Sequence, residues 1–183
     1  MNMFEETARS LAATVQLLRH DREGLNGFNN TASGFWHSFA AIILIAPLYL
    51  FIASIDWKTG ANSATGSRLV SLGALALQWV IWPVIMVFVT RWLGLGQHFA
   101  RYVIVYNWSN VVIVALLAIP ITLFKIGLLP FETTLLLTGI LQLASFYFEW
   151  YLARLSLDTS GLIAGAVVLG NFVLSVGILR IAG

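Results

Sequence analysis

Few side chains of this sequence could do chemistry, and the strongest candidate is Glu149. It lies in the segment Phe-Tyr-Phe-Glu-Trp-Tyr, near the end of a long apolar run. Gln142 precedes it by seven residues, which places both side chains on one face of a helix. An ionisable group inside a membrane span costs roughly 2.5–3.5 kcal/mol on insertion scales, so such a residue indicates a functional site. The Glu149 carboxyl would bind a proton or a cation. The alternative is an ion pair near the membrane surface with one of three arginines: Arg91, Arg101 or Arg154.

A second polar group opens the preceding apolar run. Tyr106, Asn107 and Asn110 lie within about one helical turn of one another. Amides in membrane helices usually bond to neighbouring helices, at about 0.6 kcal/mol each on average. The alternative is a pocket for a polar substrate. These three residues, with Glu149 and Gln142, form the candidate intramembrane site.

Other chemistry is not indicated by the residue types. The chain has no cysteine, which excludes disulfides, thiolate metal sites and cysteine nucleophiles. Its three histidines lack the spacing of metal ligands, and no nucleophile motif or phosphate-binding glycine loop is present. The sequence therefore predicts a protein that is not an enzyme and has no metal or cofactor.

Composition decides the kind of element that must position these residues. Of the 183 residues, 59% are hydrophobic and 10% are charged, whereas a soluble domain is about 45–50% apolar and about 25% charged. Seven of the eighteen charged side chains fall within the first 23 residues. The remainder cannot supply a water-soluble surface. A soluble enzyme, a disordered chain and a nucleic-acid-binding protein are therefore excluded, and the lipid bilayer is the first expected partner.

Five apolar runs are long enough to cross the roughly 30 Å hydrocarbon layer as helices. They cover residues 35–55, 69–90, 102–124, 131–152 and 160–181. They are continuously apolar, whereas barrel strands alternate apolar and polar residues. The sequence predicts an all-α transmembrane bundle of five helices over residues 35–183.

The segment of residues 1–34 is predicted to be a cytoplasmic amphipathic helix followed by a flexible linker. Apolar residues recur there at spacings of four and three, which defines one stripe of a helix: Phe4, Ala8, Leu11, Val15 and Leu18. We expect this helix to lie on the membrane or to pack on its own bundle. The alternative is a helix that docks a partner. Glycines between residues 21 and 34 predict the linker.

The fifth apolar run has small residues at helical spacing. Gly161 and Gly165 are four residues apart, and Gly170 follows them. Such a face lets helices approach closely, either within the bundle or between protomers. The expected partners are thus further copies of the chain or other membrane proteins.

The distribution of basic residues predicts the orientation. An odd number of spans puts the two termini on opposite sides. Six lysines and arginines fall on the N-terminal side and four on the other, so the N-terminus is expected in the cytoplasm and the C-terminus outside. The predicted location is a bacterial inner membrane.

Residues 94–109 resemble the bacterial branch of the Yip family of membrane proteins, the Ypt/Rab-interacting type. The resemblance consists of a short glycine-containing loop, then Phe99, then a run carrying Tyr106 and Ser109. An aromatic-rich run and a small-residue run follow, so the similarity extends over residues 35–183. It implies five helices, a cytosolic N-terminus and no known catalysis.

The sequence as a whole favours a non-enzymatic membrane protein that acts through helix–helix contacts. It would be an accessory or organising subunit of a membrane assembly, or a homo-oligomer. The alternative is a small transporter or channel with a polar path around Glu149.

Overall fold

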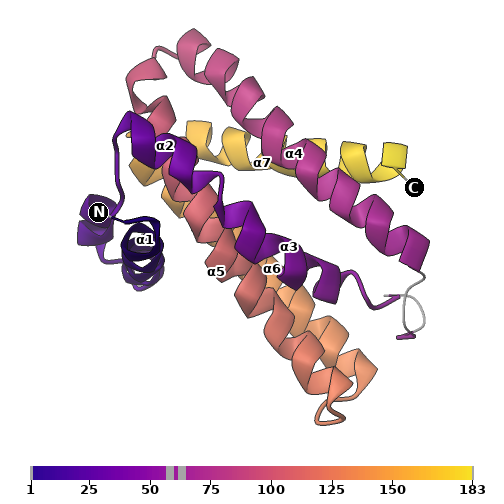
Figure 1. Cartoon of the computed structure of the whole chain (residues 1–183). Helices are drawn as coiled ribbons and strands as arrows, with labels where there is room; N and C mark the ends of the chain where they lie inside the picture. The colour runs from indigo at the N-terminus through magenta and orange to yellow at the C-terminus, as the bar shows by residue number, and fades with distance from the viewer. Residues whose placement is uncertain (1, 57–59, 62–64, 183) are drawn as a thin grey trace.

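The computed structural model describes residues 2–56, 60–61 and 65–182, and the described part of the chain is helical without strands (Figure 1). The all-α prediction is confirmed. The elements in chain order are α1 Met3–Leu18, η1 Arg22–Gly27, α2 Ala32–Ser38, α3 Ala41–Ile52, α4 Thr65–Trp92, η2 Gly96–His98, α5 Phe99–Lys125, α6 Phe131–Ser156 and α7 Gly161–Ala182.

Five segments are long and apolar enough to cross a membrane, as predicted. The first, Ala32–Ile52, consists of α2 and α3, which are separated at Phe39 and Ala40. The second, third and fourth extend beyond the predicted runs, because their polar terminal turns continue the helix, and the third also includes η2. The fifth, Gly161–Arg180, lies within its predicted run. Lys58, which contributes to the predicted orientation, lies outside the described residues.

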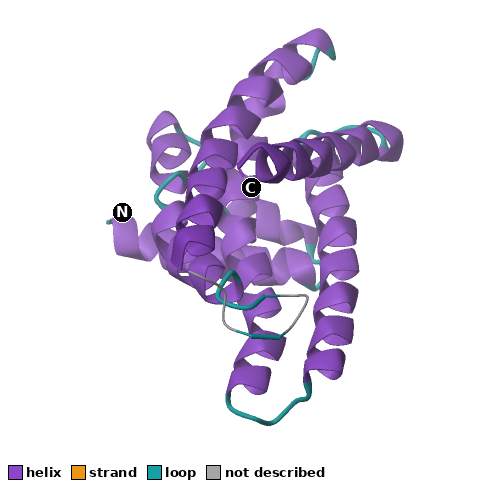
Figure 2. Ribbon diagram, turned by 90° about the vertical axis from the view of Figure 1, so that its right-hand side faces the viewer, coloured by secondary structure: helices purple, strands orange, loops and turns teal. Residues whose placement is uncertain are grey.

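The helix α5 is the centre of the bundle. It packs against α1, α2, α3, α4 and α6, and it buries a larger share of its span than the other helices do. The helix α7 instead bridges α4 and α6. A short turn joins α5 to α6 at the lower end of Figure 2. The spans α3, α4, α7, α6 and α5 thus follow one another in a ring of contacts.

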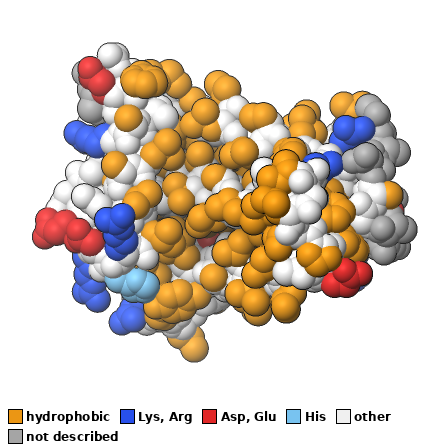
Figure 3. All heavy atoms as spheres, turned by 90° about the horizontal axis from the view of Figure 1, so that it is seen from below, with side chains coloured by type: hydrophobic (Ala, Val, Ile, Leu, Met, Phe, Trp, Pro, Cys, Tyr) orange, Lys and Arg blue, Asp and Glu red, His pale blue; other side chains and the backbone are white. Residues whose placement is uncertain are grey.

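The molecular surface has the pattern of a protein embedded in a bilayer. In the view of Figure 3, most charged side chains gather at two opposite ends, and a band of hydrophobic side chains lies between them. Large apolar residues on every span are exposed, including Ile43, Phe88 and Leu143. The chain is therefore an integral membrane protein whose apolar band contacts lipid.

The segment predicted to be a flexible linker contains a short helix. Residues 22–27 form the short helix η1, which packs on α1, and Phe28 is buried. A Cβ atom on Gly27 would lie only 2.6 Å from the Cβ of Ala13. The glycines therefore permit close packing against α1, which is a role that their helix-breaking tendency does not reveal.

The amphipathic helix of the N-terminal segment is present as α1, but the face that α1 buries differs from its apolar stripe. The buried residues are Glu6, Ser10, Ala13, Thr14 and Leu17. Phe4, Val15 and Leu18 of the stripe are exposed. The surface that α1 meets on α5 carries the hydroxyl of Ser109, which matches the small and polar residues of the buried face.

Candidate intramembrane polar site

A small cavity lies between α5, α6 and α7. Its water-accessible volume is about 10 Å³, which is room for about one water molecule. The polar residues that line it are Tyr102, Tyr106, Ser109, Asn110, Glu149, Ser156 and Asn171. This cavity brings together three of the five residues of the predicted site, namely Tyr106, Asn110 and Glu149.

Asn171 is the centre of the hydrogen-bond network around this cavity. Its Nδ2 donates to the hydroxyl of Tyr106 at 3.2 Å, and its Oδ1 accepts from Nε2 of Gln78 at 3.2 Å. The side chain is 8% exposed. One amide near the middle of α7 therefore links α7 to both α4 and α5.

The carboxyl of Glu149 completes the network from α6. It lines the cavity and contacts the Asn171 side chain. Within the described residues, no lysine, arginine or histidine lies within 4.0 Å of this carboxyl. Glu149 is thus held among neutral polar groups.

Two of the three arginines expected as alternative partners of Glu149, namely Arg101 and Arg154, have other contacts. Nε of Arg101 donates to the backbone carbonyl of Ser156 at 2.7 Å, at the end of α6. The guanidinium of Arg154 lies over the ring of Trp150, 5.6 Å from the centroid. These contacts hold both cations at the end of the bundle. Among the described residues, none of the three arginines, Arg91 included, forms an ion pair with Glu149.

Tyrosine rings and a tryptophan support the wall of the cavity. The hydroxyl of Tyr102 accepts from Nε1 of Trp82 on α4 at 3.0 Å. The rings of Tyr102 and Tyr106 stack with their centroids 5.9 Å apart. Nδ2 of Asn110 donates to the backbone carbonyl of Tyr106 at 2.8 Å, so this amide is partly satisfied within α5.

The remaining two residues of the predicted site lie elsewhere. Asn107 is fully buried between α5 and α2, where its Nδ2 donates to Oγ of Ser38 at 2.9 Å. Gln142 lines a separate groove beside α3, together with Ile52 and Leu117. The spacing that puts Gln142 and Glu149 on one helical face does not bring them into one site, because α6 meets different neighbours at the two levels.

The glycines of α7 are used inside the bundle. A Cβ atom on Gly161 would lie 3.1 Å from the ring of Trp150, whose Nε1 donates to the Gly161 carbonyl at 2.8 Å. Gly165 faces the same ring, and Gly170 faces the ring of Trp82. These glycines were predicted to allow close helix packing either within the bundle or between protomers. In the structure, they pack against tryptophan rings of the same bundle.

Two members of the network, Gln78 and Asn171, lie outside the predicted site. Each is an amide in the middle of an apolar run, which is the same signal that marks Asn107. Because Gln78 and Asn171 are 93 residues apart, the sequence does not predict that they form a hydrogen bond with each other. Only the packing of α4 against α7 reveals this pair.

The polar groups of this cavity can bind a proton, a water molecule or a small cation. In the described part of the chain, no group of three or more His, Asp or Glu residues could hold a metal ion. The lining has one carboxyl, and its other polar groups are hydroxyls and amides, which are ligands for hard cations and protons.

Comparison of the chain with protein-family models, with curated proteins and with solved structures found no match.

Proposed function

We propose that this membrane protein is not an enzyme and acts through helix–helix contacts, as an accessory or organising subunit of a membrane assembly or as a homo-oligomer. The observation that carries this proposal is an apolar groove between α4 and α7, with a volume of about 290 Å³. Such a groove fits side chains of another transmembrane helix.

The groove has a buried floor and an exposed rim. Trp82 and Met86 form its floor and are almost fully buried. Trp92 and Leu162 stand at its rim, and both are 86% exposed. Because the floor is already packed, a second helix can enter without rearrangement of the bundle.

Photo-crosslinking in native membranes tests this proposal. A benzophenone side chain is introduced at Leu162, at the rim of the groove. The matched control is Leu143 on α6, which is exposed but does not line the groove. We expect a protein adduct from the Leu162 variant and much less from the Leu143 variant. An adduct with the mass of two chains supports the homo-oligomer, and an adduct with another membrane protein supports the subunit role. Lipid adducts alone from both variants contradict the proposal.

A small transporter or channel is a second candidate, and the cavity around Glu149 favours it. The Glu149 carboxyl has no cationic partner among the described residues and contacts an amide network between four spans, which suits the binding of a proton or small cation. The cavity holds about one water molecule, so transport would require the helices to move apart.

The second candidate predicts that Glu149→Gln abolishes proton- or ion-driven flux in proteoliposomes. Glu132→Gln, at the far end of α6, is the matched control and should leave the flux unchanged. Equal flux in both variants would remove Glu149 from the mechanism.

The resemblance of residues 94–109 to the Yip family supports a non-catalytic role, since the family has no known catalysis. Membership of that family and the bacterial inner-membrane location remain predictions, as do the cytoplasmic N-terminus and external C-terminus.

A further inference from the structure

The helix α1 has three faces rather than two. Successive residues of an α-helix are rotated by about 100°. The apolar stripe, defined above by Phe4, Ala8, Leu11, Val15 and Leu18, therefore lies between two other faces. On one side is the buried face that packs on the bundle. On the other is a polar face, formed by Glu5, Arg9, Gln16 and Arg19.

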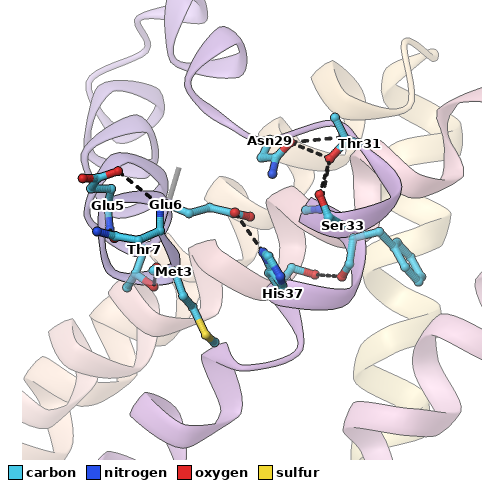
Figure 4. Close-up of polar contacts among 12 residues, drawn as sticks. Met3, Glu5, Glu6, Thr7, Asn29, Thr31, Ser33 and His37 are labelled. Carbon is cyan, nitrogen blue, oxygen red and sulfur yellow. Dashed lines mark hydrogen bonds and ion pairs between the residues drawn. The ribbon is translucent and has the colours of Figure 1, made fainter.

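The buried face of α1 is fixed to the bundle by polar contacts. The hydroxyls of Thr14 and Ser109 are 3.5 Å apart. Figure 4 shows Glu6 reaching from α1 to His37 of α2, where Oε2 lies 2.9 Å from Nδ1. These contacts set the rotation of α1 about its own axis, so the direction of the apolar stripe is also set.

The two edges of the buried face show which way the stripe points. Thr14 lies at the edge next to the stripe, and it meets α5 at Ser109, ten residues beyond the start of that helix. Arg9 and Ala13 lie toward the polar face and meet η1, where Nε of Arg9 donates to the carbonyl of Gly27 at 2.8 Å. The stripe therefore lies on the side of α1 toward the middle of the spans, and the polar face lies on the side of η1.

The end of α1 adjoins the lipid-facing surface of α6. Nε2 of His20, just after α1, lies 3.0 Å from the hydroxyl of Tyr147. Tyr147 is 53% exposed on a helix that spans the membrane. In Figure 1, α1 is viewed nearly end-on while the spans run across the view, so α1 lies across the span direction.

We propose that α1 lies in the headgroup region of the leaflet on the N-terminal side, with its apolar stripe inserted among the acyl chains. Lipid is the occupant because the end of α1 adjoins the lipid-facing surface of α6 at Tyr147, and the stripe points toward the middle of the spans. The exposed polar face carries both signs of charge, in Glu5, Arg9 and Arg19, so anionic lipid is not required. This arrangement is independent of any partner in the groove between α4 and α7.

Site-specific fluorescence on the full chain tests this proposal. The sequence contains no cysteine, so a single introduced cysteine carries the only label. An environment-sensitive dye is attached to Val15→Cys in the stripe or to Gln16→Cys in the polar face. Both positions are exposed, so neither label disturbs the packing of α1. Each labelled protein is reconstituted into phosphatidylcholine vesicles containing a spin-labelled phosphatidylcholine.

We expect blue-shifted emission and strong quenching by spin-labelled lipid at Val15, with red-shifted emission and quenching by aqueous iodide at Gln16. A spin label near the headgroup should quench Val15 more than one at the end of the acyl chain. Equal access of iodide to both positions would overturn the proposal. Disulfide-linked dimers of the Val15→Cys chain under mild oxidation would also overturn it, because a second copy would then cover the stripe.

Discussion

Asn171 shows how much one polar side chain can organise within a membrane. Its amide contacts Gln78, Tyr106 and Glu149, so it joins α7 to three other spans. Hydrogen bonds between membrane helices contribute about 0.6 kcal/mol each on average. The hydrogen bonds of Asn171 have a greater effect on the arrangement of the helices. They help to form the cavity around the Glu149 carboxyl, which α6 alone could not form.

The residue scale also yields a prediction for the glycines of α7. A Cβ atom at Gly161 would press on the Trp150 ring, whereas one at Gly165 would lie at an ordinary distance of 3.9 Å. We expect Gly161→Ala to lower the unfolding free energy by about 1–3 kcal/mol. Gly165→Ala should be neutral or should raise it by up to about 1 kcal/mol. Thermal unfolding of the purified protein in detergent measures both values.

Trp150→Phe provides the control for this pair. Phenylalanine lacks the indole atoms that would lie 3.1–3.7 Å from the new methyl group of Gly161→Ala. In that background, Gly161→Ala and Gly165→Ala should differ much less. If the two alanine variants already have equal stability with Trp150 present, contact with this ring does not decide the role of Gly161.

Among the elements, α1 differs most from what its sequence pattern indicates. Apolar periodicity in a soluble protein marks the face that packs on the core. In this chain, most of that face is exposed, with Leu11 alone packing partly on the core, and a face with Glu6, Ser10 and Thr14 is buried. The difference follows from the surroundings, since a helix beside a bilayer has an apolar neighbour other than its own protein.

The attachment of α1 to α2 gives a prediction at this scale. Glu6→Ala removes the contact with His37 and should weaken the docking of α1 by on the order of 1 kcal/mol. That loss corresponds to about a fivefold increase in the undocked population. Limited proteolysis with trypsin, which cleaves after Arg9 and Arg19, measures this population.

The matched control is Gln16→Ala, on the exposed polar face of α1. It should be cleaved at the rate of the unchanged protein. His37→Ala should resemble Glu6→Ala, because it removes the same contact from the other side. Unchanged cleavage in both the Glu6 and His37 variants would show that other contacts hold α1.

The whole molecule has an apolar band between two charged ends, and five spans cross this band (Figure 3). The ring of spans leaves apolar grooves on both sides of α7, at α4 and at α6. Because α7 packs on α4 and α6 and has a groove on each side, both of its flanks are open to further neighbours.

Single-cysteine labelling tests the topology of the whole chain. Five spans place α1 and the turn between α5 and α6 on opposite sides of the membrane. We expect Leu128→Cys in that turn to react with an impermeant maleimide in intact cells. Gln16→Cys should react only after lysis. If both cysteines react before lysis, the two positions lie on the same side and the five-span topology is wrong. If Gln16→Cys reacts before lysis and Leu128→Cys only afterwards, the span number stands and only the predicted orientation is wrong.

The sequence by itself determined the membrane class, the all-α fold and the five spans. These features depend on local properties, since a run of about 20 apolar residues is sufficient to span the hydrocarbon layer. The presence of α1 also follows from local periodicity. The residue types around Glu149 were enough to mark it as a candidate before any neighbour was known.

Only the tertiary structure decided which polar groups meet. Asn107 and Asn110 are three residues apart on α5, yet one bonds to Ser38 of α2 and the other lines the cavity with Glu149. The rotation of each helix within the bundle decides such contacts, and it depends on packing against neighbours that are distant in sequence. For the same reason, the sequence alone did not predict the hydrogen bond between Gln78 and Asn171 or the outward direction of the apolar stripe on α1.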